Sequence, residues 1–133
     1  MPLVLVADDD EDTRSIVRAL LEGENLEVIE AKDGDEALEL LAGAADGNAR
    51  VPDAIVVDFC MPNLSGIGLL RALHRFIRVP PTILMTGFPD PSIDRFAQQV
   101  GVSFVLRKPV TASELVGAVR EMLNSTANAS AKK

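Results

Sequence analysis

Acidic, hydroxyl and ammonium side chains follow the short apolar segments of this chain at four places. They are Asp8-Asp9-Asp10 after LVLVA, Asp58 after AIVV, Thr86 at the end of TILMT, and Lys108 shortly after SFVL. Carboxylates that converge repel one another, and a bound divalent cation relieves that repulsion. Mg²⁺ favours a few carboxylates together with waters and a phosphate oxygen. A carboxylate beside such an ion can attack phosphorus and form an aspartyl phosphate, so these residue types indicate metal-dependent phosphoryl chemistry.

Short apolar runs alternate with longer amphipathic segments along the chain. The runs predict five strands: Leu3–Ala7, Glu27–Ala31, Ala54–Val57, Pro81–Met85 and Ser103–Leu106. The segments between them predict five helices: Thr13–Glu22, Gly34–Leu41, Gly66–Phe76, Pro91–Val100 and one that follows Thr111, with an apolar face from Leu115 to Leu123. Five βα units in succession predict one doubly wound, flavodoxin-like (βα)5 domain of the α/β class with a five-stranded parallel sheet.

The carboxyl ends of parallel strands meet at one edge of a sheet, where ligands of such folds collect. Three of the runs are apolar without alternation, which suits strands that helices cover on both faces. We therefore expect Asp8, Asp9, Asp58, Thr86 and Lys108 to converge. Each position taken alone also has an ordinary explanation, as a solvated turn, a helix cap or a surface charge. Their occurrence at four strand ends favours a common site.

The domain is predicted to occupy residues 1–124 of the 133, and STANASAKK (Ser125–Lys133) is predicted to be a disordered tail. Gly43–Pro52 is predicted to be a loop at the opposite edge of the sheet from the acids. One cysteine, Cys60, excludes an intrachain disulfide framework. The chain shows neither a secretory leader nor an apolar run of the ~20 residues that span a bilayer, so we expect a soluble, cytoplasmic protein.

The charge of the chain argues against direct binding to nucleic acid. Twenty Asp and Glu against thirteen Lys and Arg leave a net charge of −7. Phosphate backbones are bound mainly by basic patches, and single-stranded bases by aromatic platforms. The chain has five Phe and neither Trp nor Tyr. We therefore expect protein partners.

Four segments hold the residues of the expected site: VADDDED, VVDFCMPNLSG, ILMTG and VLRKPV. In VVDFCMPNLSG, Asp58, Met61, Pro62 and Gly66 form the pattern D-x-x-M-P-x-x-x-G. With these segments the chain resembles, from residue 3 to residue 123, the receiver domains of response regulators in two-component signalling. VADDDED resembles the acidic pair after that family's first strand, VVDFCMPNLSG its phosphoacceptor signature, and ILMTG and VLRKPV its Thr/Ser and Lys-Pro strand ends.

The resemblance implies a signalling domain that catalyses only its own phosphorylation and dephosphorylation. A histidine kinase or phosphotransfer protein would transfer a phosphoryl group to Asp58, which would switch a protein–protein interaction. Thr86 would supply the switch hydroxyl and Lys108 would pair with the phosphoryl group, while the Lys108–Pro109 peptide bond would be cis. Four ligands are implied for Mg²⁺: Asp8, Asp9, Asp58 and the backbone carbonyl of Cys60.

The chain departs from the family pattern at the position that usually holds Phe or Tyr, where it has Val105. Phe104 precedes it and should point to the other face of the sheet. Phe88, two residues after Thr86, is expected to shield the acyl phosphate and slow its hydrolysis. The family's output surface would be formed by the segments 91–100, 103–106 and 112–122. We expect an output protein, an effector domain or a second copy of the chain to bind there.

Two other functions remain possible from the residues. Asp10-Glu11-Asp12-Thr13 matches the D-x-D-x-T motif of haloacid-dehalogenase-like phosphatases, although Asp8, and not Asp10, follows the first strand directly. A degenerate receiver could serve as a constitutive binding module, against which the complete acid, Thr and Lys set argues. A calcium loop starting at Asp8 is excluded, because Thr13 and Ala19 stand where Gly and Glu are needed.

Overall fold

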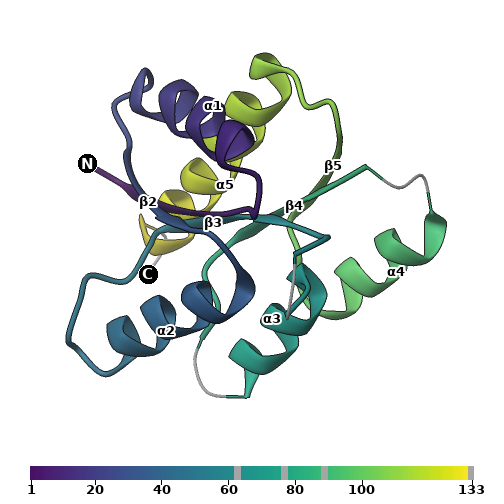
Figure 1. The fold of residues 1–133 in the computed structure, drawn as a ribbon. Helices are drawn as coiled ribbons and strands as arrows, with labels where there is room; N and C mark the ends of the chain where they lie inside the picture. Colours follow the sequence, from purple (N-terminus) through teal and green to yellow (C-terminus); the bar gives the residue numbers. More distant parts are fainter. Residues whose placement is uncertain (62–63, 76–77, 88–89, 132–133) are drawn as a thin grey trace.

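A parallel sheet of five strands, in the order β2-β1-β3-β4-β5, forms the centre of the protein (Figure 1). The computed structural model describes residues 1–61, 64–75, 78–87 and 90–131. The strands are β1 (Leu3–Ala7), β2 (Glu27–Ala31), β3 (Ala54–Asp58), β4 (Thr82–Thr86) and β5 (Phe104–Arg107). The helices are α1 (Glu11–Glu22), α2 (Gly34–Ala45), α3 (Gly66–His74), α4 (Pro91–Gln99) and α5 (Ala112–Ala131). The predicted flavodoxin-like α/β fold is confirmed.

The helices cover both faces of the sheet. Helices α1 and α5 lie on one face, and α2, α3 and α4 lie on the other (Figure 1). Side chains alternate along each strand, so Val4 and Val6 belong to the apolar cluster that includes residues of α1 and α5, while Leu5 and Ala7 belong to the one that includes residues of α2, α3 and α4. Strands β1, β3 and β4 are buried along their whole length. Their continuous apolar sequences follow from this double coverage.

Side chains at the helix N-termini satisfy backbone N–H groups that have no partner within the helix. Asp33 accepts a hydrogen bond from the Glu36 N–H at 2.8 Å, and the Thr111 hydroxyl accepts one from the Glu114 N–H at 3.1 Å. Asp90, before α4, accepts one from the Ser92 N–H at 2.9 Å. These caps set where the helices begin and so how long the loops at the carboxyl edge of the sheet are.

Several predicted boundaries differ from the structure. Helix α1 begins at Glu11, two residues before the expected Thr13, and α2 continues to Ala45 through the start of the expected Gly43–Pro52 loop. Ala44 is buried, so packing together with the high helix propensity of alanine extends α2. Helix α5 continues to Ala131, so the segment 125–131, which we expected to be disordered, is helical. The predicted end of α3 at Phe76 lies outside the described residues.

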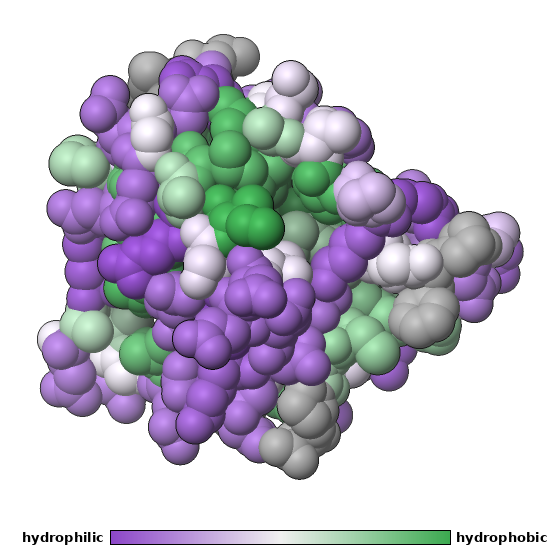
Figure 2. Space-filling model, turned by 45° about the horizontal axis from the view of Figure 1, so that its top comes forward, coloured by the Kyte–Doolittle hydropathy of each residue, from purple (hydrophilic) through white to green (hydrophobic). Residues whose placement is uncertain are grey.

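The surface of α1 also differs from the expectation. Val17 and Leu21 are buried against the sheet, whereas Ile16, which the helical pattern places on the same apolar face, is 62% exposed. Figure 2 shows the side of the molecule on which α1 and α5 lie, where hydrophobic side chains gather among hydrophilic ones. In the described part of the chain, no helix combines the length and apolar character needed to span a bilayer.

The N-terminus of α2 packs closely against the segment between β3 and α3. A Cβ atom on Gly34 would lie 2.3 Å from the Leu64 carbonyl oxygen, whereas a Cβ on Gly43 in the same helix would meet nothing within 4 Å. We expect Gly34→Ala to lower the free energy of unfolding by about 1–3 kcal/mol, because backbone must move. Gly43→Ala should raise it by up to about 1 kcal/mol through helix propensity. Urea unfolding measures both, and equal effects would contradict this packing.

Candidate functional site

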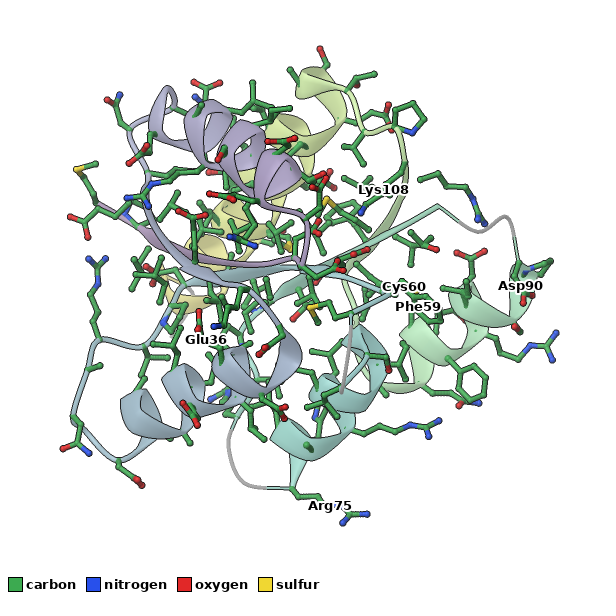
Figure 3. All side chains as sticks on the ribbon, viewed as in Figure 1. Glu36, Phe59, Cys60, Arg75, Asp90 and Lys108 are labelled. Carbon is green, nitrogen blue, oxygen red and sulfur yellow. The ribbon has the colours of Figure 1, made fainter. Side chains whose placement is uncertain are left out.

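The register of the sheet brings the predicted site residues to one edge. Ala7 pairs with Val57, so Asp8 follows β1 beside the end of β3 at Asp58. Thr86 ends β4 and pairs with Arg107, the last residue of β5. The Lys108 N–H donates to the Thr86 carbonyl at 2.7 Å. Lys108 and Cys60 thus lie on the same edge, although they follow different strands (Figure 3).

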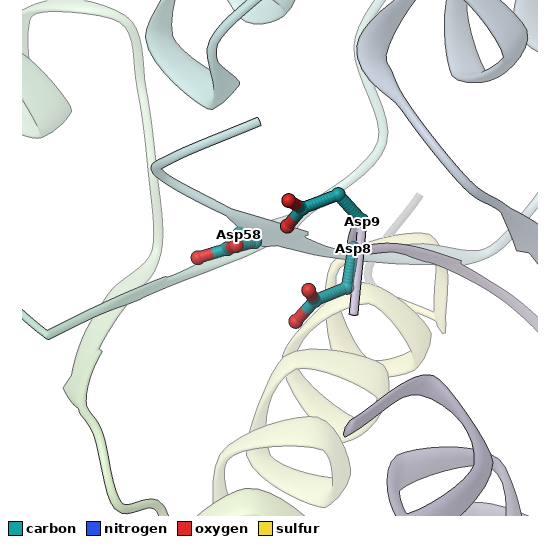
Figure 4. A group of neighbouring side chains, drawn as sticks. All are labelled: Asp8, Asp9 and Asp58. Atoms are coloured by element: carbon teal, nitrogen blue, oxygen red, sulfur yellow. The ribbon is translucent and has the colours of Figure 1, made fainter. Parts of the chain in front are cut away.

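Three carboxylates meet at this edge. Asp8, Asp9 and Asp58 each offer an oxygen, and these oxygens lie within 4.8 Å of one another (Figure 4). Asp8 is fully buried and Asp58 is 4% exposed, while Asp9 is exposed. The Asp9 carboxylate makes no hydrogen bond or ion pair with any described residue, so it is available to a ligand from solvent.

Lys108 connects the two buried carboxylates. Its Nζ lies 3.1 Å from Asp58 Oδ1 and 3.4 Å from Asp8 Oδ2. Buried carboxylates need such a partner, because removing a charge from water costs several kcal/mol per ion. The Lys108–Pro109 peptide bond is cis, as the resemblance implies.

The environment shifts the pKa values of both partners. Burial, with the nearby negative charge of Asp8, raises the pKa of Asp58 from 3.8 to about 6, against the opposing effect of the hydrogen bond from Lys108. Burial alone would lower the pKa of Lys108, but its hydrogen bond to Asp58 and the charges of Asp58 and Asp8 outweigh this and raise that pKa. At pH 7 the Lys108 ammonium group therefore lies beside an Asp58 carboxyl group that is mainly ionised.

The donor set fits a hard divalent cation. The formal charges of three carboxylates and one ammonium group leave two negative charges in excess, which one divalent cation would neutralise. The available ligand atoms are carboxylate oxygens, which suit Mg²⁺ or Ca²⁺ rather than a soft metal. The group can thus hold a metal ion.

Asp10 does not belong to this group. It precedes α1, and its carboxylate accepts a hydrogen bond from the Thr13 hydroxyl. That hydrogen bond lowers the pKa of Asp10, although the residue is at the surface. Asp10 therefore closes the turn before α1, while Asp8 and Asp9 face the site.

Gly66 of the expected signature has a packing role at the start of α3. A Cβ on this residue would lie 2.6 Å from the Asp58 carbonyl oxygen and 3.0 Å from Leu84 Cδ1. The Gly66 N–H donates to the Phe59 carbonyl at 3.1 Å. Only a glycine lets α3 begin this close to the backbone of Asp58, so the glycine of the motif helps to place the acidic residue.

Two further predicted residues, Thr86 and Cys60, lie at the same edge. Thr86 is 1% exposed, and Cys60 is exposed. Val105 and Phe104 pack on opposite sides of the sheet, as expected from strand alternation. Pro62 and Phe88 lie outside the described residues.

Sequence reasoning missed Arg14, whose Nη1 donates to the Asp8 carbonyl at 2.7 Å. No motif marked it, because this contact depends on how α1 lies against the sheet.

Comparisons with known proteins agree on one family. The family model of the response regulator receiver domain matches residues 4–120. Transcriptional regulatory protein CpxR of Escherichia coli strain K12 is 33% identical over 124 residues, which are 92% of this chain and 50% of that protein. Response regulator MprA of Mycobacterium sp. strain KMS is 35% identical over 127 residues, which are 95% and 53% of the two. The chain thus spans about half the length of these relatives.

Solved structures give the same result for the fold. The receiver domain of Francisella response regulator 1452 superposes with a TM-score of 0.84 at 31% identity, over 95% of this chain and 99% of that one. A response regulator receiver domain from Clostridium thermocellum has a TM-score of 0.84 at 30% identity, over 95% and 97% of the two chains.

The raised pKa of Asp58 makes its charge a cost to folding in metal-free buffer. Because folded Asp58 holds its proton more tightly than the unfolded chain does, stability is lost as the pH rises from 3.8 to about 6. Asp58→Asn should therefore raise the free energy of unfolding at pH 7 by about 1–2 kcal/mol, and by little near pH 4. Urea unfolding across this pH range measures the difference.

Asp10→Asn is the matched control for this effect. The pKa of Asp10 is lowered, so its ionised form favours folding, and its replacement should lower stability at pH 7. If Asp58→Asn also proves less stable than the wild type at pH 7, the proposed cost of the Asp58 charge is wrong.

Proposed function

The chain belongs to the response regulator receiver domain family, and on this premise we propose that Asp58 accepts a phosphoryl group from a phosphohistidine donor in a Mg²⁺-dependent reaction. The observation that carries this proposal is the arrangement of Asp58 beside Asp8, Asp9 and Lys108. A carboxylate with acidic neighbours and one ammonium partner suits metal-assisted phosphoryl transfer better than it suits a structural ion pair.

In the proposed reaction, a carboxylate oxygen of Asp58 forms a bond to phosphorus. The bond between phosphorus and the histidine nitrogen breaks, and that nitrogen keeps the electron pair. Asp58 must be ionised to attack, which its pKa of about 6 allows at neutral pH. A Mg²⁺ ion held by Asp8, Asp9, Asp58 and the backbone carbonyl of Cys60 would offset the negative charge of the incoming phosphoryl group.

Lys108 and Thr86 are the groups that we assign to the phosphoryl oxygens. The Lys108 ammonium already lies 3.1 Å from Asp58 Oδ1, so it can pair with a phosphoryl oxygen with little movement. Thr86 ends the strand next to β3, and we propose that its hydroxyl turns toward the phosphoryl group. That movement would change the segment after β4, which leads into α4, and bias two pre-existing conformations of the domain.

We propose a histidine kinase or a phosphotransfer protein as the donor. Helix α1 begins three residues after Asp8, at the carboxyl edge of the sheet. The exposed Ile16 lies on this helix and offers an apolar contact for the donor. For output we propose a protein contact on the surface of α4, β5 and α5, with an effector domain, another protein or a second copy of the chain. Phe96, 43% exposed on α4, is an apolar group on this surface.

The two other functions are not favoured. A phosphatase with Asp10 as nucleophile would need that carboxylate in the metal group, and it is bonded to Thr13 at the start of α1 instead. A binding module without phosphorylation would not need two buried carboxylates around one lysine, which is costly to fold.

Phosphorylation can be tested with acetyl phosphate and Mg²⁺. The wild type is expected to gain the mass of one phosphoryl group, and Asp58→Asn is expected to gain none. Asp10→Asn should behave as the wild type, because that carboxylate lies outside the group. Mass spectrometry of the intact protein measures all three. A single phosphoryl group on Asp58→Asn would refute the assignment, and loss of uptake only in Asp10→Asn would favour the phosphatase.

Metal binding can be tested by thermal unfolding without any phosphoryl donor. Mg²⁺ at ten times its dissociation constant should add about 1.4 kcal/mol of stability to the wild type. Asp9→Asn should lose this gain while it folds normally, because Asp9 is exposed. Asp10→Asn should keep it. If both variants respond to Mg²⁺ as the wild type does, Asp9 is not a ligand.

A further inference from the structure

Arg14 of α1 holds the backbone next to the acidic residues. Its Nη1 donates to the carbonyl oxygen of Asp8 at 2.7 Å, and its Nε donates to Glu30 Oε1 at 3.2 Å. The side chain is 15% exposed. The planar guanidinium can reach both acceptors at once, which an ammonium group on a flexible stem does less well. Glu30, the residue before the end of β2, therefore orients Arg14, and Arg14 orients the carbonyl of Asp8.

The backbone N–H, the carbonyl oxygen and both carboxylate oxygens of Asp8 each have a hydrogen bond or an ion pair with another residue. Its N–H donates to the Ala31 carbonyl at 3.1 Å, and its Oδ1 accepts from the Asp10 N–H at 2.9 Å. Lys108 lies at its Oδ2, and Arg14 at its carbonyl oxygen. The carbonyl is the one that belongs to the peptide unit joining Asp8 to Asp9. Arg14 thus controls the orientation of that unit.

Asp9 depends on this peptide unit more than Asp8 does. Its carboxylate is exposed and has no hydrogen bond or ion pair with any described residue, so no side-chain contact holds it near Asp8 and Asp58. Only its backbone keeps its oxygens within 4.8 Å of the other two carboxylates. A rotation of the Asp8–Asp9 peptide would carry the Asp9 side chain away from the group.

We propose that Arg14, oriented by Glu30, is a positioning residue that keeps Asp9 in place to bind the metal ion. This inference rests on the proposed metal-dependent phosphorylation of Asp58. Arg14 touches neither the phosphoryl group nor the ion, and acts through the backbone of Asp8. Residues that orient metal ligands in this way commonly change metal affinity by about 10–100-fold when they are replaced.

Arg18 supplies a matched control one turn further along α1. Its Nη1 lies 2.7 Å from Glu30 Oε2, so it pairs with the same carboxylate as Arg14 does. It also pairs with Glu22 at 3.4 Å, and it makes no contact with Asp8. Arg14→Met and Arg18→Met remove the same charge and each breaks an ion pair with Glu30. Only the former removes the hydrogen bond to the Asp8 carbonyl.

The test is a titration with Mg²⁺ alone, followed by the backbone amide signals of residues 8–10 in NMR spectra. We expect Arg14→Met to raise the dissociation constant by about tenfold or more. Arg18→Met should leave the constant unchanged, and Arg14→Lys should restore part of the affinity because an ammonium can still donate to the carbonyl. Equal constants for Arg14→Met and Arg18→Met would overturn the proposal.

Two further measurements keep the result unambiguous. If Arg14→Met does not fold, Arg14→Lys and Arg18→Lys form the comparison, and only the former should weaken Mg²⁺ binding. With acetyl phosphate at saturating Mg²⁺, Arg14→Met should reach the wild-type rate, because it lowers affinity and leaves Asp58 intact. Failure of the proposed function would look different: the wild type would not bind Mg²⁺, or Asp58→Asn would still take up phosphate.

Discussion

Two carboxylates, Asp8 and Asp58, are buried side by side at the carboxyl edge of the sheet, with the ammonium group of Lys108 between them. Charges in this position would repel one another and lose their hydration, at a cost on the order of several kcal/mol for each ion. One lysine offsets part of that cost, and the pKa of Asp58 stays raised to about 6. The site thus keeps an excess of negative charge, which favours the binding of a cation.

The rest of the fold holds Asp8, Asp58 and Lys108 together despite the free-energy cost of burying their charges. The strands β1, β3 and β4 are buried along their length, so the ends that carry Asp8, Asp58 and Thr86 have little freedom to move apart. The loops after them are shaped by close contacts. Gly66 lets α3 begin against the carbonyl of Asp58, and Arg14 fixes the carbonyl of Asp8 from the other layer of helices.

The same construction suits a domain that must respond to a change of charge. Addition of a phosphoryl group would alter the partner of Lys108 and the balance of charge at one edge, while the two apolar clusters on either side of the sheet remain packed. A response can then travel through the loops that join this edge to the helices. Because the exposed apolar side chains Ile16 and Phe96 lie on α1 and α4, the proposed donor and the proposed output partner would contact different surfaces.

The sequence by itself determined the order of the elements, the parallel sheet and the edge at which the site lies. Apolar runs such as AIVV indicate a strand that is buried on both faces of the sheet. An acidic residue directly after such a strand must lie at the carboxyl edge of the sheet. The ends of the helices were predicted less accurately than their order. Small residues such as those after Leu41 suit a loop as well as a helix, so the continuation of α2 to Ala45 was missed, as was that of α5 to Ala131.

Only the tertiary structure decided how the site residues differ from one another. Asp8 and Asp9 are neighbours of the same type, yet Asp8 is buried and paired with Lys108, while Asp9 is exposed and has no hydrogen bond or ion pair with a described residue. The contact of Arg14 with Asp8 and that of Lys108 with both buried acids join parts of the chain that lie up to 100 residues apart. Local patterns report which face of an element is apolar. They do not report which side chain of a packed neighbour reaches a given polar atom, because that depends on how helices and strands pack in three dimensions.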